Sequence, residues 1–377
     1  MPETTVLNKK RSLNIAVIGI KGIPARYGGF ETCADETCRR LVDNGHSVTV
    51  YCRRGMSEEE PNNYAGIRLR YVTYLKSKNL ATISATFFSC IKELFTNTDV
   101  IHLYTVGTGL FVPVFRLFGK KTVVSVDALD WARKKWSKFA RLYMQLAAQL
   151  VVWWADELII DSKTIQEYYR VRFRRAGEYV PFGANIEPYR GSEVLNKLGL
   201  TPRKYILFVG ILRSDKQVED LIRAFDSLQQ SEYDLVILGD NPLEKDYVAN
   251  LKILAGPRVH FPGKFYGEPY TQICQNAFMY VTPSGIEGTS PALLSAMGYG
   301  CCVLVNGIPE NLETIGDAGF SYAKNDIQDL AKKLTELMSH PNLVEQYGKK
   351  AQQRVKCTYS WDQVANEFEQ IYYRISG

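Results

Sequence analysis

A turn with one carboxylate, followed by a clearly marked helix start, is the stretch of this 377-residue sequence best suited to chemistry. The apolar run Phe278 to Val281 leads into this turn, which carries Glu287 and then Gly288. Ser290 can cap the helix that follows, and Pro291 suits its first position. Backbone N–H groups at such a start bind anions such as phosphate, and Glu287 beside them can accept hydrogen bonds from hydroxyls. The stretch predicts a sugar-nucleotide site, with an ordinary capped helix as the alternative.

A second candidate lies in the glycine-rich loop near the start of the chain. Gly28 and Gly29 directly precede a predicted helix that opens near Glu31. Two glycines at a helix start allow close backbone approach to a phosphate or to sugar hydroxyls. The glycine spacing is not G-x-G-x-x-G, so a dinucleotide site is not indicated. A glycine turn without a ligand is the alternative.

Both motifs, taken in their order along the chain, resemble family 4 glycosyltransferases, which are retaining enzymes with the GT-B fold. The loop over 18–31 resembles the rhamnosyltransferase-like subgroup. Residues 283–300 contain the family's framework of Pro-Ser, Glu-Gly, Leu-Leu, Ala-Met and Gly. The resemblance extends over residues 14–375. The family pattern places a second Glu eight positions after the first, where this chain has Ser295 after Glu287.

The resemblance implies roles for further residues. Glu287 would hold the donor sugar, and the N–H groups near Thr289 and Ser290 would hold the oxygens of the diphosphate. Lys216 matches a lysine that grips the diphosphate in the family. Cations at that place stabilise the charge that grows on the departing diphosphate.

The family's arginine position after Gly210 is occupied by Ile211, and Arg213 could replace that cation from a different angle. At Ser295, where relatives have a Glu that bonds the ribose, a shorter and weaker contact is expected. With two departures in one donor site, either the donor is held in an altered way or the enzyme is impaired.

Asp127 follows the predicted strand Thr122–Val126, at a strand end where carboxylates often have a function. The rhamnosyltransferase-like subgroup has a similar aspartate, so we expect Asp127 to hold or deprotonate the acceptor hydroxyl. The alternative is a helix N-cap, for which Asp130 is better placed. Asp-x-Asp is absent, so no metal site and no cofactor beyond the nucleotide-sugar substrate is implied.

Charge is unevenly distributed along the chain. Residues 1–190 hold 28 Lys and Arg against 18 Asp and Glu, whereas the remainder holds 18 against 22. A basic first half favours an anionic partner there, and no nucleic-acid-binding module accompanies it. An anionic membrane surface or a lipid-diphosphate acceptor fits better. The eight cysteines form no C-x-x-C, which indicates thiols in a reducing cytosol, and we expect a cytoplasmic protein at the inner face of the membrane.

Short β-rich segments alternate with helical patterns, which predicts an α/β fold with parallel sheets. The resemblance makes this the GT-B fold, with two Rossmann-like doubly wound domains facing across a cleft. The expected parts are a disordered segment at 1–13, an acceptor-side domain at 14–185, a nucleotide-sugar domain at 186–358, and a last helix at 359–377 that crosses back to the first domain. The expected strands are 14–19, 47–51, 67–72, 100–104, 122–126, 157–160, 178–180, 205–209, 234–238, 259–261, 278–281 and 302–305.

A predicted helix at Lys135–Ala155 carries a long apolar stripe. We expect this stripe to be domain core, and the basic opposite face is the candidate for contact with anionic lipid. The stripe consists of Phe139, Leu142, Tyr143, Leu146, Ala147, Leu150, Val151 and Trp154.

These observations predict a retaining glycosyltransferase that moves a hexose or deoxyhexose, with rhamnose favoured, from a nucleoside-diphosphate sugar. The expected acceptor is a lipid-linked or growing surface glycan. A catalytically impaired paralogue that binds an active enzyme remains an alternative because of Ile211 and Ser295. A nicotinamide-dependent oxidoreductase or epimerase is disfavoured, since neither G-x-G-x-x-G nor a suitably placed Tyr-x-x-x-Lys is present.

Overall fold

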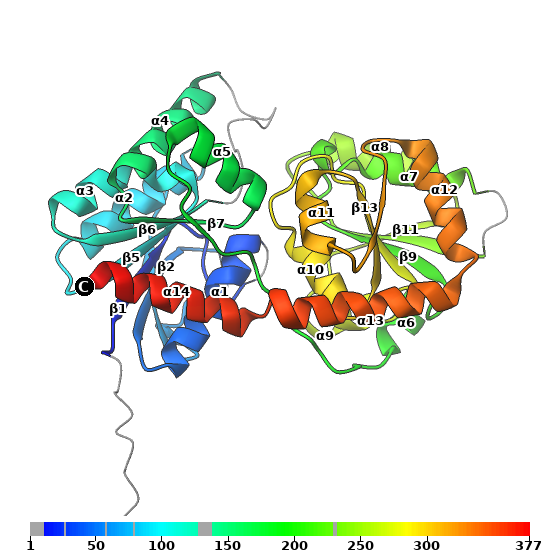
Figure 1. The fold of residues 1–377 in the computed structure, drawn as a ribbon, viewed down its shortest axis with the longest axis horizontal. Helices are drawn as coiled ribbons and strands as arrows, with labels where there is room; N and C mark the ends of the chain where they lie inside the picture. The colour runs from blue at the N-terminus through cyan, green and yellow to red at the C-terminus, as the bar shows by residue number, and fades with distance from the viewer. Residues whose placement is uncertain (1–10, 26–27, 57–58, 78–79, 127–137, 229–231) are drawn as a thin grey trace, which may run out of the picture. The chain divides into compact units, whose positions relative to one another are not determined.

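The computed structural model describes residues 11–25, 28–56, 59–77, 80–126, 138–228 and 232–377. Two compact units are present, and each is described here by itself (Figure 1). Unit 1 comprises Met1–Ile160, Gln166–Tyr179 and Ala365–Gly377, and unit 2 comprises Asp161–Ile165 and Val180–Val364.

Unit 1 is built on an eight-stranded sheet of order β3-β4-β2-β1-β5-β6-β7-β8, in which only the β3–β4 pair is antiparallel. Without the short β3, the order is 3-2-1-4-5-6-7, which is that of a doubly wound sheet whose order reverses between β1 and β5. The strands are β1 (Asn14–Ile18), β2 (Ser47–Arg53), β3 (Asn63–Tyr64), β4 (Ile67–Val72), β5 (Val100–Tyr104), β6 (Lys121–Val126), β7 (Glu157–Ile160) and β8 (Glu178–Tyr179).

Helices cover both faces of this sheet. Helices α1 and α14 share one face, since neighbouring side chains of β5 bond to both: Tyr104 to Cys33 of α1, and His102 to Tyr372 of α14. Helices α2, α3 and α4 and the 3-10 helix η1 lie together on the other face (Figure 1). The bounds are α1 (Gly29–Asp43), α2 (Ala81–Glu93), η1 (Val106–Phe111), α3 (Val112–Leu117), α4 (Lys138–Trp154), α5 (Lys163–Phe173) and α14 (Trp361–Ser376).

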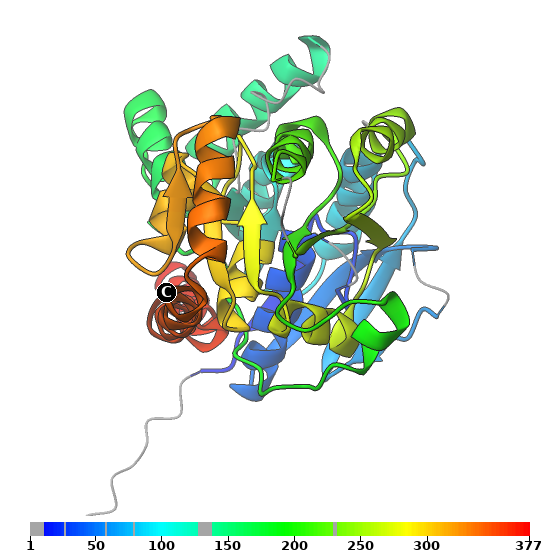
Figure 2. The same cartoon turned by 90° about the vertical axis from the view of Figure 1, so that its right-hand side faces the viewer.

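Unit 2 contains a six-stranded parallel sheet of order β11-β10-β9-β12-β13-β14. Neighbouring strands of this sheet run parallel, as the yellow arrow of β12 and the orange arrow beside it illustrate (Figure 2). The order is again 3-2-1-4-5-6, and it reverses between β9 and β12. The strands are β9 (Tyr205–Val209), β10 (Asp234–Leu238), β11 (Val259–Gly263), β12 (Met279–Thr282), β13 (Cys302–Asn306) and β14 (Phe320–Tyr322).

The core of unit 2 forms where amphipathic helices pack on this sheet. Helix α7 contributes Val218, Leu221, Ile222 and Phe225, an i, i+3, i+4, i+7 stripe that is completely buried. The helices are α6 (Glu193–Leu198), α7 (Val218–Asp226), α8 (Lys245–Leu254), α9 (Gly267–Gln275), α10 (Pro291–Gly298), α11 (Pro309–Ile315), α12 (Ile327–Met338) and α13 (Pro341–Thr358), with the 3-10 helix η3 at Ser214–Lys216.

The predicted α/β fold with two parallel sheets is confirmed, and each expected strand lies within two residues of an observed one. The prediction for the α4 stripe was partly wrong. Phe139, Leu142 and Leu146 are 86%, 64% and 48% exposed, whereas the buried residues of α4 are Met144, Ala147, Ala148, Val151 and Val152. The small residues face inward because η1 packs closely on α4: a Cβ on Gly109 would lie 2.4 Å from the carbonyl oxygen of Ala147.

The final helix is fixed to the sheet of unit 1 by a buried polar network. The Nδ1 of His102 is 2.6 Å from the hydroxyl of Tyr372, and its Nε2 is 2.7 Å from that of Ser125. Burial lowers the pKa of His102 to about 3. His102 is therefore neutral in the folded chain at neutral pH, with one ring nitrogen donating and the other accepting.

This network predicts a specific acid sensitivity. An unfolded histidine takes up a proton below a pH of about 6.5, which the folded His102 does not, so stability is lost as the pH falls from that value. The expected contribution to the slope is about 1.4 kcal/mol of unfolding free energy per pH unit. Urea unfolding between pH 6.5 and pH 5 measures it. His102→Gln should flatten the slope by this amount, and His340→Gln, at an exposed histidine, should leave it unchanged.

Candidate active site

The candidate donor site lies in unit 2 at the carboxyl ends of β9 and β12. These strands are direct neighbours, with Met279 paired to Ile206 and Tyr280 to Leu207, and the strand order reverses between them. Doubly wound sheets bind ligands at such a reversal point. The loop after β9 carries Lys216, and the loop after β12 carries Glu287, so the sheet brings both predicted residues to one edge.

Lys216 and Glu287 form an ion pair. The Nζ of Lys216 donates to Oε1 of Glu287, and the two side chains are only 16% and 11% exposed. Burying either charge alone would be costly, and the contact offsets the burial of both. The pair places a cation and a carboxylate within reach of the same bound molecule.

The start of α10 differs in one detail from the sequence prediction. Ser290 occupies the N-cap position, but its side chain makes no capping hydrogen bond. The first-turn N–H groups of the helix are therefore not used by this hydroxyl. Just before the helix, the N–H of Thr289 donates to Oδ2 of Asp161 over 3.3 Å, and Asp161 is 4% exposed. A carboxylate thus lies at the place predicted for an anion.

The loop after β9 holds a second cation. Arg213 donates through both Nε and Nη2 to the carboxylate of Asp215, with 2.6 Å between Nη2 and Oδ2. This two-point contact fixes the direction of the guanidinium group. Ile211, at the family's arginine position, is 51% exposed, so its side chain fills no core space.

The remaining predicted donor residues lie on or beside α10. Gly288 is half-buried in the loop before the helix, and Ser295 is half-buried one turn inside it. The hydroxyl of Ser295 is shorter than a glutamate side chain, and a contact with a ribose would need a closer ligand or a bridging water.

Sequence reasoning missed the amide network that supports the Glu287 loop. The Nδ2 of Asn306, at the end of β13, donates to the carbonyl oxygen of Pro283 over 3.0 Å and to Oδ1 of Asn325 over 2.8 Å. Its Oδ1 accepts from the N–H of Asn325, and Gln217 lies 3.3 Å from the same amide. Asn306 is completely buried. The sequence signal that could have found Asn306 was its position at the end of a predicted β strand in the second half of the chain.

Glu310, in the first turn of α11, was also missed. Burial raises the pKa of Glu310, and the neighbouring carboxylates of Glu313 and Glu287 raise it further, against the opposing effect of Lys324. Carboxyl groups with a raised pKa are common in functional sites, and this one lies near Glu287. Glu310 therefore joins the candidate site.

In unit 1 the glycine-rich loop lies at the other reversal point, after β1. Gly28 is the N-cap of α1 with a φ of 102°, and a Cβ there would lie 2.0 Å from the carboxylate of Glu31. Glu31 in turn accepts from the N–H of Lys21 over 2.9 Å. With a carboxylate already at this helix start, contact with sugar hydroxyls suits Gly28 and Gly29 better than contact with phosphate. Asp127 lies outside the described residues.

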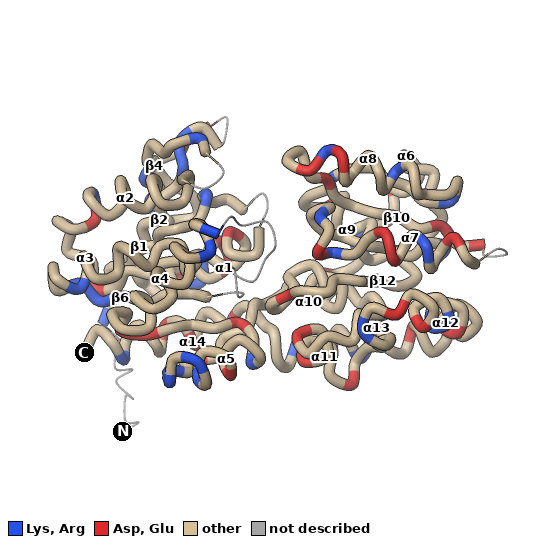
Figure 3. Tube along the Cα trace, turned by 90° about the horizontal axis from the view of Figure 1, so that it is seen from above, with Lys and Arg blue, Asp and Glu red and all other residues tan. Residues whose placement is uncertain are grey.

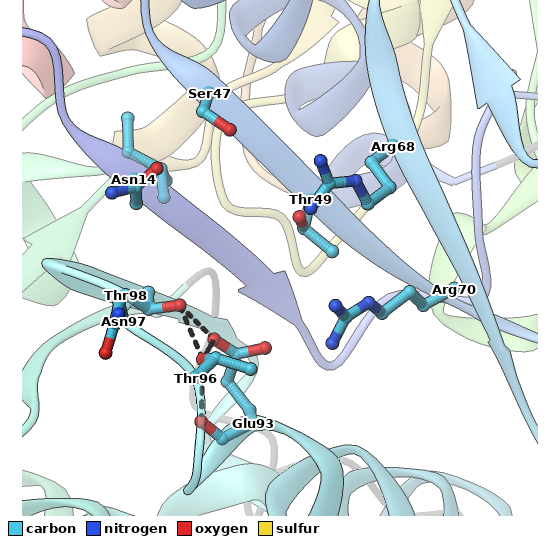
Figure 4. A pocket seen from close by; sticks show the side chains of 10 residues that line it. Asn14, Ser47, Thr49, Arg68, Arg70, Glu93, Thr96, Asn97 and Thr98 are labelled. Carbon is cyan, nitrogen blue, oxygen red and sulfur yellow. Dashed lines mark hydrogen bonds between the residues drawn. The ribbon is translucent and has the colours of Figure 1, made fainter.

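A polar pocket of about 190 Å³ lies at the opposite, amino-terminal ends of β1, β2 and β4 in unit 1 (Figure 4). Arg70 in its wall donates to the hydroxyl of Tyr51, which donates to the buried Glu93 over 2.6 Å. Because ligands of doubly wound sheets bind at the carboxyl ends, this pocket is not a candidate for the donor. Within the described residues, no three His, Cys, Asp or Glu side chains are grouped to hold a metal ion.

Comparison with known proteins identifies the part of the chain that carries this site. Residues 193–354 match the family profile described as "Glycosyl transferases group 1". This part of the chain is therefore similar to group 1 glycosyltransferases. Residues 12–185 match a domain of unknown function, DUF1972. The segment that matches the glycosyltransferase profile contains Lys216, Glu287 and the whole of α10.

Among curated proteins, the chain is 29% identical over 165 residues to the D-rhamnosyltransferase WbpZ of Pseudomonas aeruginosa, which is 42% of each chain. It is 25% identical over 177 residues to the capsular polysaccharide biosynthesis glycosyltransferase CapM of Staphylococcus aureus, 44% of each chain. The chain thus spans less than half the length of these two relatives.

Solved structures show the same fold over the whole chain. A sucrose-phosphate synthase from Thermosynechococcus elongatus has a TM-score of 0.81 at 20% identity, covering 96% of this chain and 98% of that one. HepE from Anabaena, in complex with UDP and glucose, has a TM-score of 0.78 at 16% identity, covering 96% and 100%. At these identities the likeness shows the fold alone, and the fold is that of GT-B glycosyltransferases.

The amide network of unit 2 yields a prediction. Asn306→Ala leaves the carbonyl of Pro283 and the amide of Asn325 without a partner, which should cost about 1–3 kcal/mol of stability. Because the Glu287 loop is then no longer fixed, the rise in melting temperature caused by a nucleoside diphosphate should fall by more than half.

The matched control is Asn276→Ala. The side chain of Asn276, at the end of α9, is another buried amide of unit 2, and it donates to the backbone carbonyls of Gly191 and Gln272. This variant should lose similar stability and keep the full nucleotide response. Equal nucleotide responses in the two variants would contradict a role for Asn306 in supporting the donor loop.

Proposed function

We propose that the chain is a retaining glycosyltransferase that moves a hexose or deoxyhexose, with rhamnose favoured, from a nucleoside-diphosphate sugar to a lipid-linked or growing surface glycan. The observation that carries this proposal is the Lys216–Glu287 pair beside the start of α10. A cation can bind the diphosphate, a carboxylate can bind sugar hydroxyls, and the start of a helix whose Ser290 side chain makes no capping bond can bind phosphate oxygens. The similarity to WbpZ, a D-rhamnosyltransferase, supports the choice of sugar, and the similarity to CapM, a capsular polysaccharide biosynthesis glycosyltransferase, supports the surface glycan.

In the proposed reaction the bond between the anomeric carbon and the diphosphate oxygen breaks. The acceptor hydroxyl forms its bond to the same face of that carbon, and its proton passes to the departing diphosphate or to Asp127. Lys216 and Arg213 would stabilise the negative charge that grows on the diphosphate, and Glu287 would hold the sugar hydroxyls. No protein nucleophile and no metal ion takes part in this scheme.

For Lys216 to reach the diphosphate, its contact with Glu287 has to loosen. The incoming phosphate charge supplies the replacement partner, and the sugar hydroxyls supply donors to the carboxylate. Because the exchange leaves neither buried charge without a partner, it avoids the large free energy cost of breaking a buried ion pair. The pair therefore suits an active site whose donor takes over both partners.

No helix in the described part of the chain is long and apolar enough to cross a membrane. We place the reaction in the cytoplasm, at the inner face of the membrane, because a lipid-linked acceptor has to be reached there.

An impaired paralogue that binds an active partner enzyme is the second candidate. It is favoured by Ile211 and Ser295, which remove a cation and a carboxylate from the family's pattern. The retained pair of Lys216 and Glu287 argues against it, because a chain without catalytic constraint gains nothing from a buried ion pair at this place.

Turnover of the purified chain with nucleoside-diphosphate sugars decides between these functions. Wild type should transfer sugar with retention and in the presence of EDTA, and Glu287→Gln should lower turnover by a factor of about 100 or more, as loss of one preorganised polar contact to the reacting group does. Glu345→Gln, at an exposed glutamate paired with Lys349, is the control and should be fully active. Absence of turnover with a normal nucleotide-induced rise in melting temperature would favour the paralogue.

A further inference from the structure

The face of unit 1 formed by α2, α3 and α4 exposes many large apolar side chains. On α4 the exposed residues Phe139, Leu142, Leu146 and Trp153 fall at intervals of three, four and seven, which aligns them along one side of the helix. They are 86%, 64%, 48% and 67% exposed. Soluble proteins rarely expose a row of this kind without a partner.

The neighbouring helices extend this row into a surface. Phe87, Ile91 and Phe95, on and just after α2, are 47%, 47% and 80% exposed. Leu117 and Phe118 at the end of α3 are 77% and 53% exposed, and the rings of Phe118 and Phe95 lie 6.2 Å apart. Helix α3 is joined to α4 by a hydrogen bond from Arg116 to the carbonyl of Trp154, and both helices, like α2, contact η1. The exposed apolar side chains therefore belong to neighbouring helices on one face of unit 1.

The charges on these elements are almost all positive. Within 80–126 and 138–154 there are six basic residues: Lys92, Arg116, Lys120, Lys121, Lys138 and Arg141. The only acidic residues in the same stretches are Glu93, which is 1% exposed, and Asp99, which pairs with Arg11. Asp156 at the start of β7 lies 3.5 Å from Arg116 and 3.6 Å from Lys121 and compensates one charge. Figure 3 shows Lys and Arg positions in blue near α3 and β6.

We propose that this surface of α2, α3 and α4 docks on an anionic lipid bilayer, with its apolar side chains inserted at the boundary of headgroups and acyl chains. Apolar area and basic residues together are what holds helices in a membrane interface. The inference deepens the proposed function, on which it rests for the lipid-linked acceptor. The sequence analysis expected the apolar stripe of α4 to be core and only the basic face to contact lipid. The proposal instead places the exposed apolar residues of α4 against the lipid as well.

A second copy of the chain is the competing occupant of the surface. In a two-fold dimer both copies contribute the same patch, so the positive charges of Lys138 and Arg141 from both copies would be brought into one interface. Such like-charge contact opposes association, whereas anionic headgroups neutralise it. Charge complementarity therefore favours the membrane.

Flotation of the full chain with vesicles tests the proposal. Wild type should bind vesicles of mixed phosphatidylglycerol and phosphatidylcholine and should bind pure phosphatidylcholine more weakly. The double variant Phe139→Ser with Leu142→Ser should lower partition into the anionic vesicles by roughly tenfold or more, because each exposed side chain loses its apolar burial. The control is Leu243→Ser with Ile253→Ser, two residues of unit 2 that are 79% and 82% exposed, and it should bind like wild type.

A charge variant separates the two contributions. Lys138→Glu with Arg141→Glu should weaken binding and remove most of its dependence on salt, since exposed charges are screened at high ionic strength. The nucleotide-induced rise in melting temperature should persist in every variant, so a failed donor site and a failed membrane surface give different results. The proposal is overturned if wild type ignores anionic vesicles, if both double serine variants bind equally, or if light scattering shows a dimer that Phe139→Ser with Leu142→Ser dissociates.

Discussion

The pairing of β9 with β12 is the constraint on which the candidate site depends. Three α-helices and two other strands separate these strands in the sequence. They are nevertheless neighbours in the sheet because the strand order reverses between them. Parallel strands end at one edge, so the loops that follow must meet there. Lys216 and Glu287, 71 residues apart, become an ion pair for this reason. The side-chain amide of Asn306, at the end of the next strand β13, then fixes the loop that carries Glu287.

Carboxylates of the protein contact the groups that are expected to bind anions. Glu287 holds Lys216, Asp215 holds Arg213, and Asp161 accepts from the N–H of Thr289. A bound diphosphate has to compete with these internal partners. The cost of that exchange is small only if the carboxylates find new donors, which sugar hydroxyls can provide. The arrangement therefore favours the complete nucleotide sugar over a bare phosphate.

Much of the fold could be predicted from the sequence, because β-rich segments and 3.6-residue periodicity mark the strands and helices of a doubly wound sheet. The strand before the Glu287 turn followed from the same pattern, whereas Lys216 was singled out by the resemblance to the family. Their mutual contact did not, since it depends on the strand order. The amide network of Asn306 was missed because a buried asparagine has no periodic signal.

The faces of α4 show where periodicity alone is insufficient. The helix carries apolar residues on more than one side, and the sequence does not say which side meets the sheet. The close approach of η1 at Gly109 selects the side with Ala147, Ala148 and Val151, because only small side chains fit there. The bulky residues Phe139 and Leu142 are left outside.

The central claim is that the donor binds at the edge formed by β9 and β12 and exchanges the partner of Lys216. A crystal structure with an intact, non-hydrolysable nucleotide-sugar analogue tests it most directly. We expect the diphosphate against the first turn of α10, with the Nζ of Lys216 bonded to a phosphate oxygen and the Glu287 carboxylate bonded to sugar hydroxyls. A diphosphate bound elsewhere, with the Lys216–Glu287 pair unchanged, would contradict the account.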